Sequence, residues 1–157
     1  MNDGSSALSP YGERALEVVR EVAEHALKTG RARLDFEDDL INLRPLDPQA
    51  CPVSVDAYSG QIDMFVGPEG DAWTHELWKR EESERLRELR LCVQAVVTGN
   101  YEGGLKTEKA RFLWWRWEDV EFRGTFHTEE GVITFGHHGL GPQRTAGCSA
   151  YHRFAPY

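Results

Sequence analysis

The feature that most constrains this chain is the segment 112–117, FLWWRW, which holds three of its five tryptophans. In an extended strand successive side chains point to opposite faces, so Trp115 and Trp117 share one face and Trp114 lies on the other. Tryptophan is large, and its indole N–H needs a hydrogen-bond partner wherever it is buried. The segment therefore predicts a strand with one face in a core and an aromatic side chain on the opposite face.

Length and composition indicate one ordinary globular domain covering 1–157. The chain has 157 residues, of which 40% are hydrophobic and 28% charged, and this length is enough for a hydrophobic core. The first residues lack the pattern of a signal peptide, and no apolar run is long enough to span a bilayer, so we expect no membrane contact. The three cysteines, Cys51, Cys92 and Cys148, form no paired motif. An odd number of isolated cysteines favours reduced thiols and a cytoplasmic location.

The charge is acidic and unevenly distributed. A net charge of −8 argues against a nucleic-acid partner, which requires a basic patch, and is compatible with a basic protein partner. All 26 acidic residues lie at or before Glu130. We expect residues 1–8 to be disordered and residues 136–157 to form an irregular tail without acidic residues.

The N-terminal third predicts one helix and one strand. Ser9 is a suitable N-cap before Pro10, an apolar stripe follows at helical spacing, and Gly30 is a natural end. Residues 31–36 then alternate like a strand. Residues 37–52 contain three prolines and are interpreted mostly as loop.

The middle of the chain predicts a hairpin and a second helix. A two-residue turn at Ser59-Gly60 brings six apolar side chains of 53–66 onto one face of the hairpin. The three cross-strand pairs are Ala57 with Ile62, Val55 with Met64, and Val53 with Val66. A helix is expected over much of 74–98, ending at Gly99.

The last third predicts an antiparallel meander with two turns. A tight turn at Glu118-Asp119 is expected to place Trp115 opposite Phe122 and to give favourable cross-strand pairs on the other face. Those pairs are Arg116 with Glu121 and Trp114 with Arg123. A four-residue turn at 128–131 is expected to place Phe126 opposite Ile133 and Gly124 opposite Phe135.

These elements predict an α+β fold in the order αβββαβββ. The expected architecture is a single antiparallel sheet of about six strands, with two helices packed on one face and the other face largely exposed to solvent.

Two groups of side chains have the residue types of a chemical site. The 53–66 hairpin places Asp56 directly opposite Asp63, and a pair of carboxylates can share acid–base work or hold a divalent metal. Solvation by water or an arginine is the simpler interpretation of that pair. His137, His138, Cys148 and His152 are zinc-ligand residue types, and Cys148 and His152 have a tolerable local spacing, but no C-x2-C or H-E-x-x-H motif accompanies them. They are therefore only weak metal candidates, and we expect no cofactor.

The remaining candidate is the solvent-facing side of the predicted meander, which carries Phe112, Trp114, Arg116, Glu121 and Arg123. Aromatic residues with arginines are the composition of protein–protein hot spots. Two other occupants of this face stay open, namely the aromatic tail of the chain and a second copy in a homodimer.

The sequence favours a non-catalytic cytoplasmic protein-binding module, either an adaptor or an inhibitor of the immunity type that engages a basic partner. An enzyme is the less favoured class because no catalytic constellation is recognisable. Its concrete form is a small hydrolase that uses Asp56 and Asp63, with or without a divalent metal.

Overall fold

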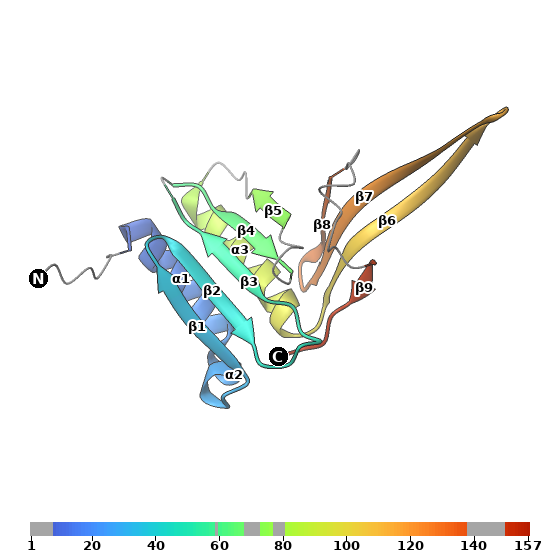
Figure 1. Cartoon of the computed structure of the whole chain (residues 1–157). Coiled ribbons are helices and arrows are strands. Elements are labelled where there is room, and N and C mark those ends of the chain that lie inside the picture. The colour runs from blue at the N-terminus through green and yellow to red at the C-terminus, as the bar shows by residue number, and fades with distance from the viewer. Residues whose placement is uncertain (1–7, 59, 68–72, 77–80, 138–149) are drawn as a thin grey trace, which may run out of the picture.

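The computed structural model describes residues 8–58, 60–67, 73–76, 81–137 and 150–157 (Figure 1). Within these ranges the chain is α+β and contains helices and two antiparallel sheets. The helices are α1 (Pro10–Val22), α2 (Glu24–Lys28) and α3 (Glu82–Val97). None of the described helices is long and apolar enough to cross a membrane.

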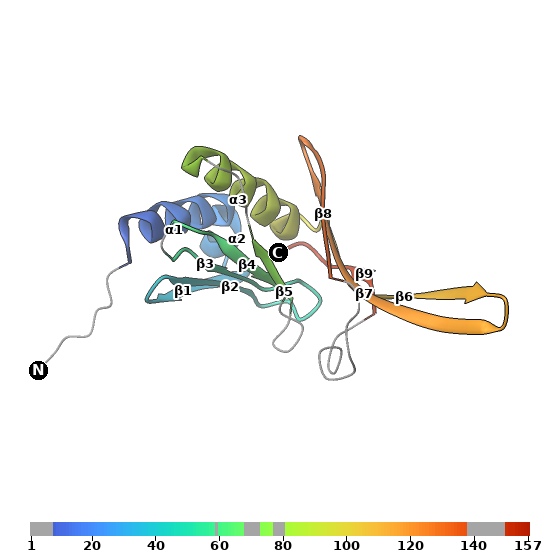
Figure 2. The ribbon, with the colours of Figure 1, turned by 90° about the horizontal axis from the view of Figure 1, so that it is seen from above.

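The first sheet is a five-stranded meander in the order β1-β2-β3-β4-β5. Its strands are β1 (Ala32–Glu37), β2 (Leu40–Pro45), β3 (Val53–Asp56), β4 (Asp63–Val66) and β5 (Trp73–Glu76). The helices lie on one face of this sheet (Figure 2). Residues with less than 2% exposure on that face include Ile41, Leu43, Val55 and Met64, so the main core lies between the helices and the first sheet.

The second sheet has the order β8-β7-β6-β9. Its strands are β6 (Tyr101–Phe112), β7 (Trp115–Thr128), β8 (Gly131–His137) and β9 (His152–Arg153). The hairpin of β6 and β7 is long, and its outer part projects away from the rest of the molecule (Figures 1 and 2).

The start of α1 and the β3–β4 hairpin confirm the local predictions. The Ser9 hydroxyl accepts a hydrogen bond from the Gly12 N–H, and Pro10 is the first helical residue. In the hairpin, Val53 pairs with Val66 and Val55 with Met64. All six predicted apolar side chains of the hairpin are buried. Ser59 of its turn lies outside the described residues.

Several predicted elements are wrong in extent. The expected single sheet of six strands is two sheets, of five and four strands in the described residues. The expected loop 37–52 contains β2, whose Ile41 and Leu43 face the core, while Asn42, which is also buried, and the exposed Arg44 lie on the other face of the sheet. The alternation of apolar and polar residues in β2 is short and is flanked by turn residues, so the sequence pattern does not indicate a strand there. The expected helix 74–98 begins only at Glu82, because Trp73–Glu76 pairs with β4 as β5.

The order of elements differs accordingly from αβββαβββ, with a short second helix, two additional strands before α3 and one additional strand at the C-terminal end. The expected irregular tail 136–157 is partly regular, since β8 runs to His137 and β9 covers His152–Arg153. Of the N-terminal residues 1–8, only Leu8 is described.

The predicted turn at Glu118-Asp119 is also wrong. β7 runs without interruption through these residues, and the two-residue turn lies at Leu113-Trp114 instead, with Phe112 paired to Trp115. A turn five residues earlier lets β6 and β7 form twelve consecutive residue pairs. The second turn is confirmed, because Phe126 pairs with Ile133 and Gly124 with Phe135.

Residues 150–157, here called the C-terminal strap, connect the two sheets. The Phe154 N–H donates to the Tyr101 carbonyl of β6, and the Ala155 N–H donates to the Gln49 carbonyl, which lies between β2 and β3. The Tyr157 N–H donates to the Val97 carbonyl at the end of α3, and its hydroxyl donates to the Cys51 carbonyl. Burial raises the pKa of the Tyr157 hydroxyl well above its usual range, so this donor stays protonated at any physiological pH.

The strap makes one glycine especially sensitive. Gly99 ends α3 with a φ of +73°, and a Cβ placed there would lie 2.9 Å from the ring of Pro156 in the strap. Gly30 follows α2 with a similar φ of +67°, and nothing lies within 4 Å of its Cβ position. An alanine at either position would therefore have the same backbone strain, and only the alanine at position 99 would also clash with a neighbouring residue.

We expect Gly99→Ala to lower the free energy of unfolding by about 2–4 kcal/mol, because positive-φ strain and a clash with Pro156 add together. Gly30→Ala is the matched control and is expected to cost only about 1 kcal/mol. Urea unfolding of both variants measures the difference. Equal losses in the two variants would contradict the strap contact.

Candidate functional site

The outer part of the β6–β7 hairpin is the candidate site. Beyond Leu105 and Phe122, no other described strand pairs with β6 or β7. Residues 106–121, here called the arm, therefore form a two-stranded ribbon that extends roughly 20 Å at the usual rise per residue. Figure 1 shows the arm projecting from the body of the molecule.

The end of the arm exposes large apolar side chains. Trp114 is 80% exposed, Trp115 68% and Leu113 61%. Tryptophan and leucine at this exposure contribute apolar surface at the point of the molecule farthest from its core. Single exposed apolar residues are common on protein surfaces, but three in succession at one tip form a patch of the kind that marks interaction sites.

Two arginines lie directly opposite each other beside these residues. The register pairs Arg111 of β6 with Arg116 of β7, and like charges at this spacing destabilise a sheet by about 0.2–1 kcal/mol. The Arg111 Nε donates to the Leu113 carbonyl at 3.2 Å. Within the described part of the chain, no carboxylate forms an ion pair with either arginine. An anionic group from outside would remove this repulsion.

The turn itself is strained. Leu113 has a φ of +54°, a backbone region that is uncommon for residues other than glycine, asparagine and aspartate. Such strain costs about 1–3 kcal/mol and occurs most often where a ligand or partner is held. Exposed apolar surface, opposed arginines and a strained turn therefore coincide at one end of the arm, which we call the tip (Arg111 to Arg116).

The structure separates the predicted aromatic–arginine face into two places. Trp114 and Arg116 belong to the tip, and Phe112 is the β6 residue that precedes the turn. Glu121 and Arg123 lie at the base of the arm, about 20 Å away along β7. Because β7 is continuous, Arg116 is on the opposite face of the strand from Glu121 and Arg123.

The predicted cross-strand pairs are replaced accordingly. Arg116 is opposite Arg111 rather than Glu121, and Arg123 is opposite Gly104 rather than Trp114. Glu121 is only 5% exposed and receives two hydrogen bonds from the Arg123 guanidinium, at 2.8 and 3.2 Å. Glu121 and Arg123 therefore form an internal ion pair, and this pair is a structural feature of the fold.

The carboxylate pair is found where the sequence predicted it. Asp56 of β3 and Asp63 of β4 are directly opposite each other, and Glu76 of β5 continues the row in the register. Burial raises the pKa of the Asp56 carboxyl, and the charges of Asp63 and Asp39 raise it further. Within the described residues no group of three or more His, Cys, Asp or Glu side chains could hold a metal ion.

We expect Asp56→Asn to raise the free energy of unfolding at pH 7 by a few tenths to about 1 kcal/mol. A carboxyl whose pKa is higher in the folded state is destabilising when ionised, and this penalty disappears as the pH falls through the folded-state pKa. The gain should therefore vanish near pH 3, below the ordinary value for aspartate of about 3.9.

Asp35→Asn is the matched control, since Asp35 is exposed and its cross-strand partner is Asn42. Urea unfolding of both variants at the two pH values measures the effect. A variant at Asp56 that is no more stable than wild type at pH 7 would show that the repulsion is already offset.

The histidine and cysteine candidates are only partly described. His138 and Cys148 lie outside the described residues, and the structure gives only the backbone of His137 at the end of β8. The His152 ring packs on Phe154 with ring centroids 4.2 Å apart, and its Nδ1 lies 2.7 Å from the Ala150 carbonyl. Whether these weak metal candidates come together is therefore not tested by the described residues.

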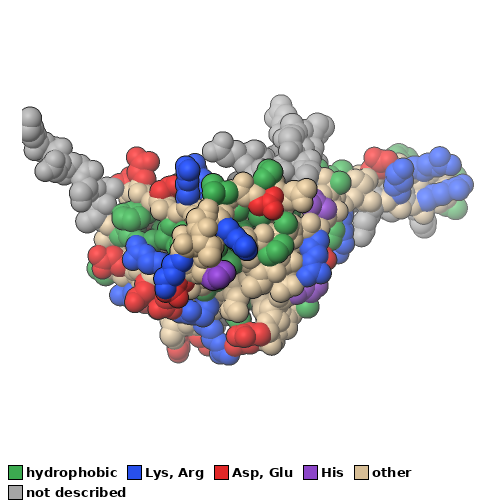
Figure 3. Space-filling model, turned by 90° about the horizontal axis from the view of Figure 1, so that it is seen from below, with side chains coloured by type: hydrophobic (Ala, Val, Ile, Leu, Met, Phe, Trp, Pro, Cys, Tyr) green, Lys and Arg blue, Asp and Glu red, His purple; other side chains and the backbone are tan. Residues whose placement is uncertain are grey.

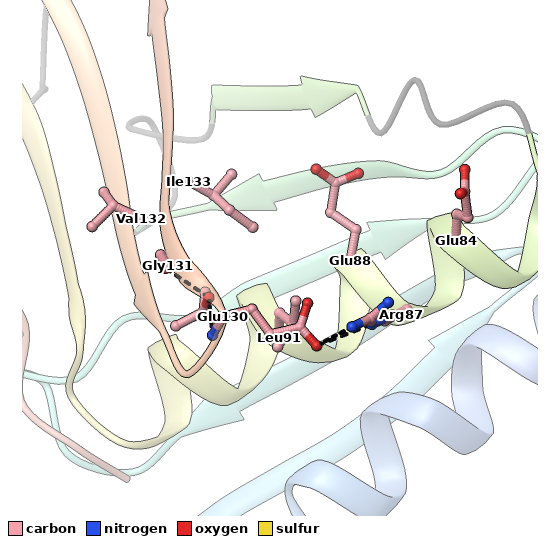
Figure 4. A pocket seen from close by; sticks show the side chains of 9 residues that line it. Glu84, Arg87, Glu88, Leu91, Glu130, Gly131, Val132 and Ile133 are labelled. Atoms are coloured by element: carbon pink, nitrogen blue, oxygen red, sulfur yellow. Dashed lines mark hydrogen bonds and ion pairs between the residues drawn. The ribbon is translucent and has the colours of Figure 1, made fainter.

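A cavity of about 320 Å³ lies between α3 and the β7–β8 turn (Figure 4). Leu91 from α3 and Val132 and Ile133 from β8 give it an apolar lining. Three carboxylates, Glu84, Glu88 and Glu130, also line it. Arg87 also lines the cavity and forms an ion pair with Glu130, which joins α3 to the turn and leaves Glu84 and Glu88 as the excess of negative charge.

The sequence reasoning missed Leu113, Trp115 and Arg111 as site residues. Trp115 and Leu113 were assigned to the buried face of the meander because of the turn chosen at 118–119. The symmetry of basic residues around 113–114 was a usable signal, since a turn there opposes Arg111 and Arg116. The cavity had no sequence signal, because its residues come from 84–91 and 128–133, which are distant in the chain.

In comparisons with protein-family models, curated proteins and solved structures, none matches this chain. The function is therefore argued from the residues of the site alone.

Proposed function

We propose that this chain is a non-catalytic protein-binding module that engages its partner through the tip of the arm. The observation that carries the proposal is the coincidence, at the end of a projecting ribbon, of exposed Trp114 and Trp115 with the opposed pair Arg111 and Arg116. Tryptophan and arginine are the residues most enriched in interface hot spots.

The energetics of the tip support a role in binding. Exposed apolar surface, like-charge opposition and a positive φ at Leu113 each cost free energy in the isolated chain. A partner with an apolar pocket and acidic groups would bury the tryptophans and neutralise the arginines. The exposed apolar surface and the opposed arginines that destabilise the free tip would then contribute affinity.

The charge of the tip favours an acidic partner, whereas the net charge of the whole chain favours a basic one. Residues 109–117 contain three basic residues and no acidic ones, so an acidic site fits the tip better than a basic one. A basic partner, as an inhibitor of the immunity type would need, fits the acidic remainder of the chain instead. We propose a cytoplasmic location for the module, supported by the free, buried thiol of Cys92.

Partner capture at low protein concentration tests the proposal. Immobilised wild type is expected to retain a partner protein from the native cell lysate that Trp114→Ala does not retain, because losing a hot-spot tryptophan costs about 2–4 kcal/mol, a factor of about 30 or more. Tyr58→Ala is the matched control, since Tyr58 is 67% exposed and lies on the first sheet's β3–β4 hairpin. Equal retention by wild type and Trp114→Ala would refute binding through the tip.

The alternative function, a small hydrolase, is supported by Asp56 alone, whose raised pKa is a property of general acids. Under that alternative, Asp56→Asn would abolish hydrolysis and Trp114→Ala would not.

A further inference from the structure

We propose that the tip of the arm of one copy docks into the cavity between α3 and β8 of a second copy. This inference rests on the proposed function, in which the tip is the binding element, and it names a partner for that element. The chain carries both an aromatic, basic tip and an acidic, apolar cavity, and these two surfaces are complementary.

The cavity has the composition needed to receive such a tip. Ile133 of β8 is partly buried and lines the cavity, so some apolar surface is accessible there. Its neighbour Val132 points to the opposite side of β8 (Figure 4). In Figure 4, Glu84 and Glu88 point from α3 to the same side, and Ile133 lies beside Glu88. A volume of about 320 Å³ is at the lower end of the range for sites that enclose a ligand group.

The tip supplies the matching groups. Trp114 or Trp115 provides the apolar body that would cover Ile133. Arg111 and Arg116, directly opposite each other in the register, provide two guanidinium groups for the carboxylates of the cavity. Arginine–carboxylate pairs are often bidentate, which gives both strength and orientation.

The distribution of charge over the molecule supports contact between copies. Figure 3 shows Lys and Arg side chains gathered near the end of the arm, with hydrophobic atoms at the tip. Each copy carries a net charge of −8, so whole copies repel one another at long range. The attraction of the proposed contact therefore comes from the short-range pairing of the basic tip with the cavity carboxylates.

The contact joins two different surfaces, which determines the possible assemblies. If two copies exchange arms around a two-fold axis, each tip fills the other's cavity and a closed dimer results. If the rotation between copies does not close, the same contact produces longer assemblies. The mass in solution distinguishes a closed dimer from longer assemblies, and both assemblies would contain the proposed contact.

Sedimentation of the pure protein tests the inference. Wild type is expected to exceed the monomer mass at concentrations of up to about 1 mM, where even a millimolar contact is substantially populated. Trp114→Ala should weaken association by a factor of about 30 or more. A wild type that remains monomeric over this range would overturn the inference.

A charge exchange between copies gives the sharpest test. The double variant Arg111→Glu/Arg116→Glu reverses the tip, and Glu84→Arg/Glu88→Arg reverses the cavity. Each variant alone should be monomeric, because its tip and cavity then carry the same charge. An equimolar mixture should associate again, since each tip now meets a cavity of opposite charge.

Glu13→Arg/Glu17→Arg is the matched control for the cavity variant. It makes the same charge change at the same helical spacing on exposed residues of α1, and it should associate like wild type. A mixture of the two reversed variants that remains monomeric, with both variants folded by circular dichroism, would refute the contact.

The outcomes separate this inference from the proposed function. A monomeric wild type that still captures a partner through Trp114 refutes only the contact between copies. Association of the pure protein that depends on Trp114, without capture of any foreign protein, supports the contact and limits the tip to self-association.

Discussion

Replacing Phe154 with alanine is expected to lower the free energy of unfolding by about 3–5 kcal/mol. Phe154 is 8% exposed, and its ring stacks on Tyr101 with centroids 5.5 Å apart. Tyr101 in turn contacts Phe126 of β7 at 4.7 Å. Truncation therefore opens a cavity where the C-terminal strap, β6 and β7 meet.

Urea unfolding followed by tryptophan fluorescence measures this loss. Tyr157→Phe serves as a milder companion, because it removes only the hydroxyl that donates to the Cys51 carbonyl. We expect Tyr157→Phe to lower the free energy of unfolding by about 0.5–1.5 kcal/mol through the lost hydrogen bond. The loss rises to about 3 kcal/mol where the buried Cys51 carbonyl is left without a water partner. A Phe154→Ala variant that loses less than about 1 kcal/mol would contradict the role of the strap in joining the two sheets.

Replacing Arg123 with methionine is expected to cost about 2–4 kcal/mol of stability while leaving binding through the tip intact. Breaking a buried ion pair by removing one partner costs about 3–5 kcal/mol, and the partial exposure of Arg123 reduces that figure. The Glu121 carboxylate lies close to Gly136, since a Cβ placed on Gly136 would be 2.6 Å from the Glu121 Oε1. The carboxylate therefore has little room to reach water once its two guanidinium bonds are lost.

The double variant Glu121→Gln/Arg123→Met should recover part of this loss, because the charge left behind is then removed. Thermal unfolding gives the stabilities, and the capture experiment with Trp114→Ala as reference gives the binding. Loss of binding in a folded Arg123→Met protein would restore Glu121 and Arg123 to the interface that the sequence predicted.

The elements that could be predicted from sequence are those whose signals are local. Ser9 and Pro10 define the start of α1 through capping chemistry, and alternation over 53–66 defines the register of β3 and β4. In these cases a few neighbouring residues determine the backbone. The α+β class followed from them because apolar helices need a sheet to cover.

The arm could not be predicted because its turn lacks turn residues. Leu113-Trp114 has no glycine, asparagine or aspartate, although Leu113 adopts a positive φ, and Glu118-Asp119 appeared to be the better turn. Moving a turn by five residues changes which side chains share a face. For this reason Arg116 was paired with Glu121, and Trp115 was placed in a core.

The candidate site depended on that same register. Phe112, Trp114 and Arg116 were found from their composition, but their neighbour Arg111 is revealed only by the pairing of β6 with β7. The cavity required α3 and the β7–β8 turn to meet in space, a tertiary contact with no local signal. The Asp56–Asp63 pair was predictable because one short hairpin creates it.

The C-terminal strap also has a kinetic consequence. Its hydrogen bond between Tyr157 and Cys51 joins residues 106 positions apart in the chain, and contacts of such long sequence separation are slow to form because the intervening loop must first close. The meander of the first sheet can form from neighbouring segments, whereas the junction of the two sheets must wait for residues 150–157. We therefore expect refolding to end in a slow phase, visible as late protection of the Tyr157 amide in pulsed hydrogen exchange.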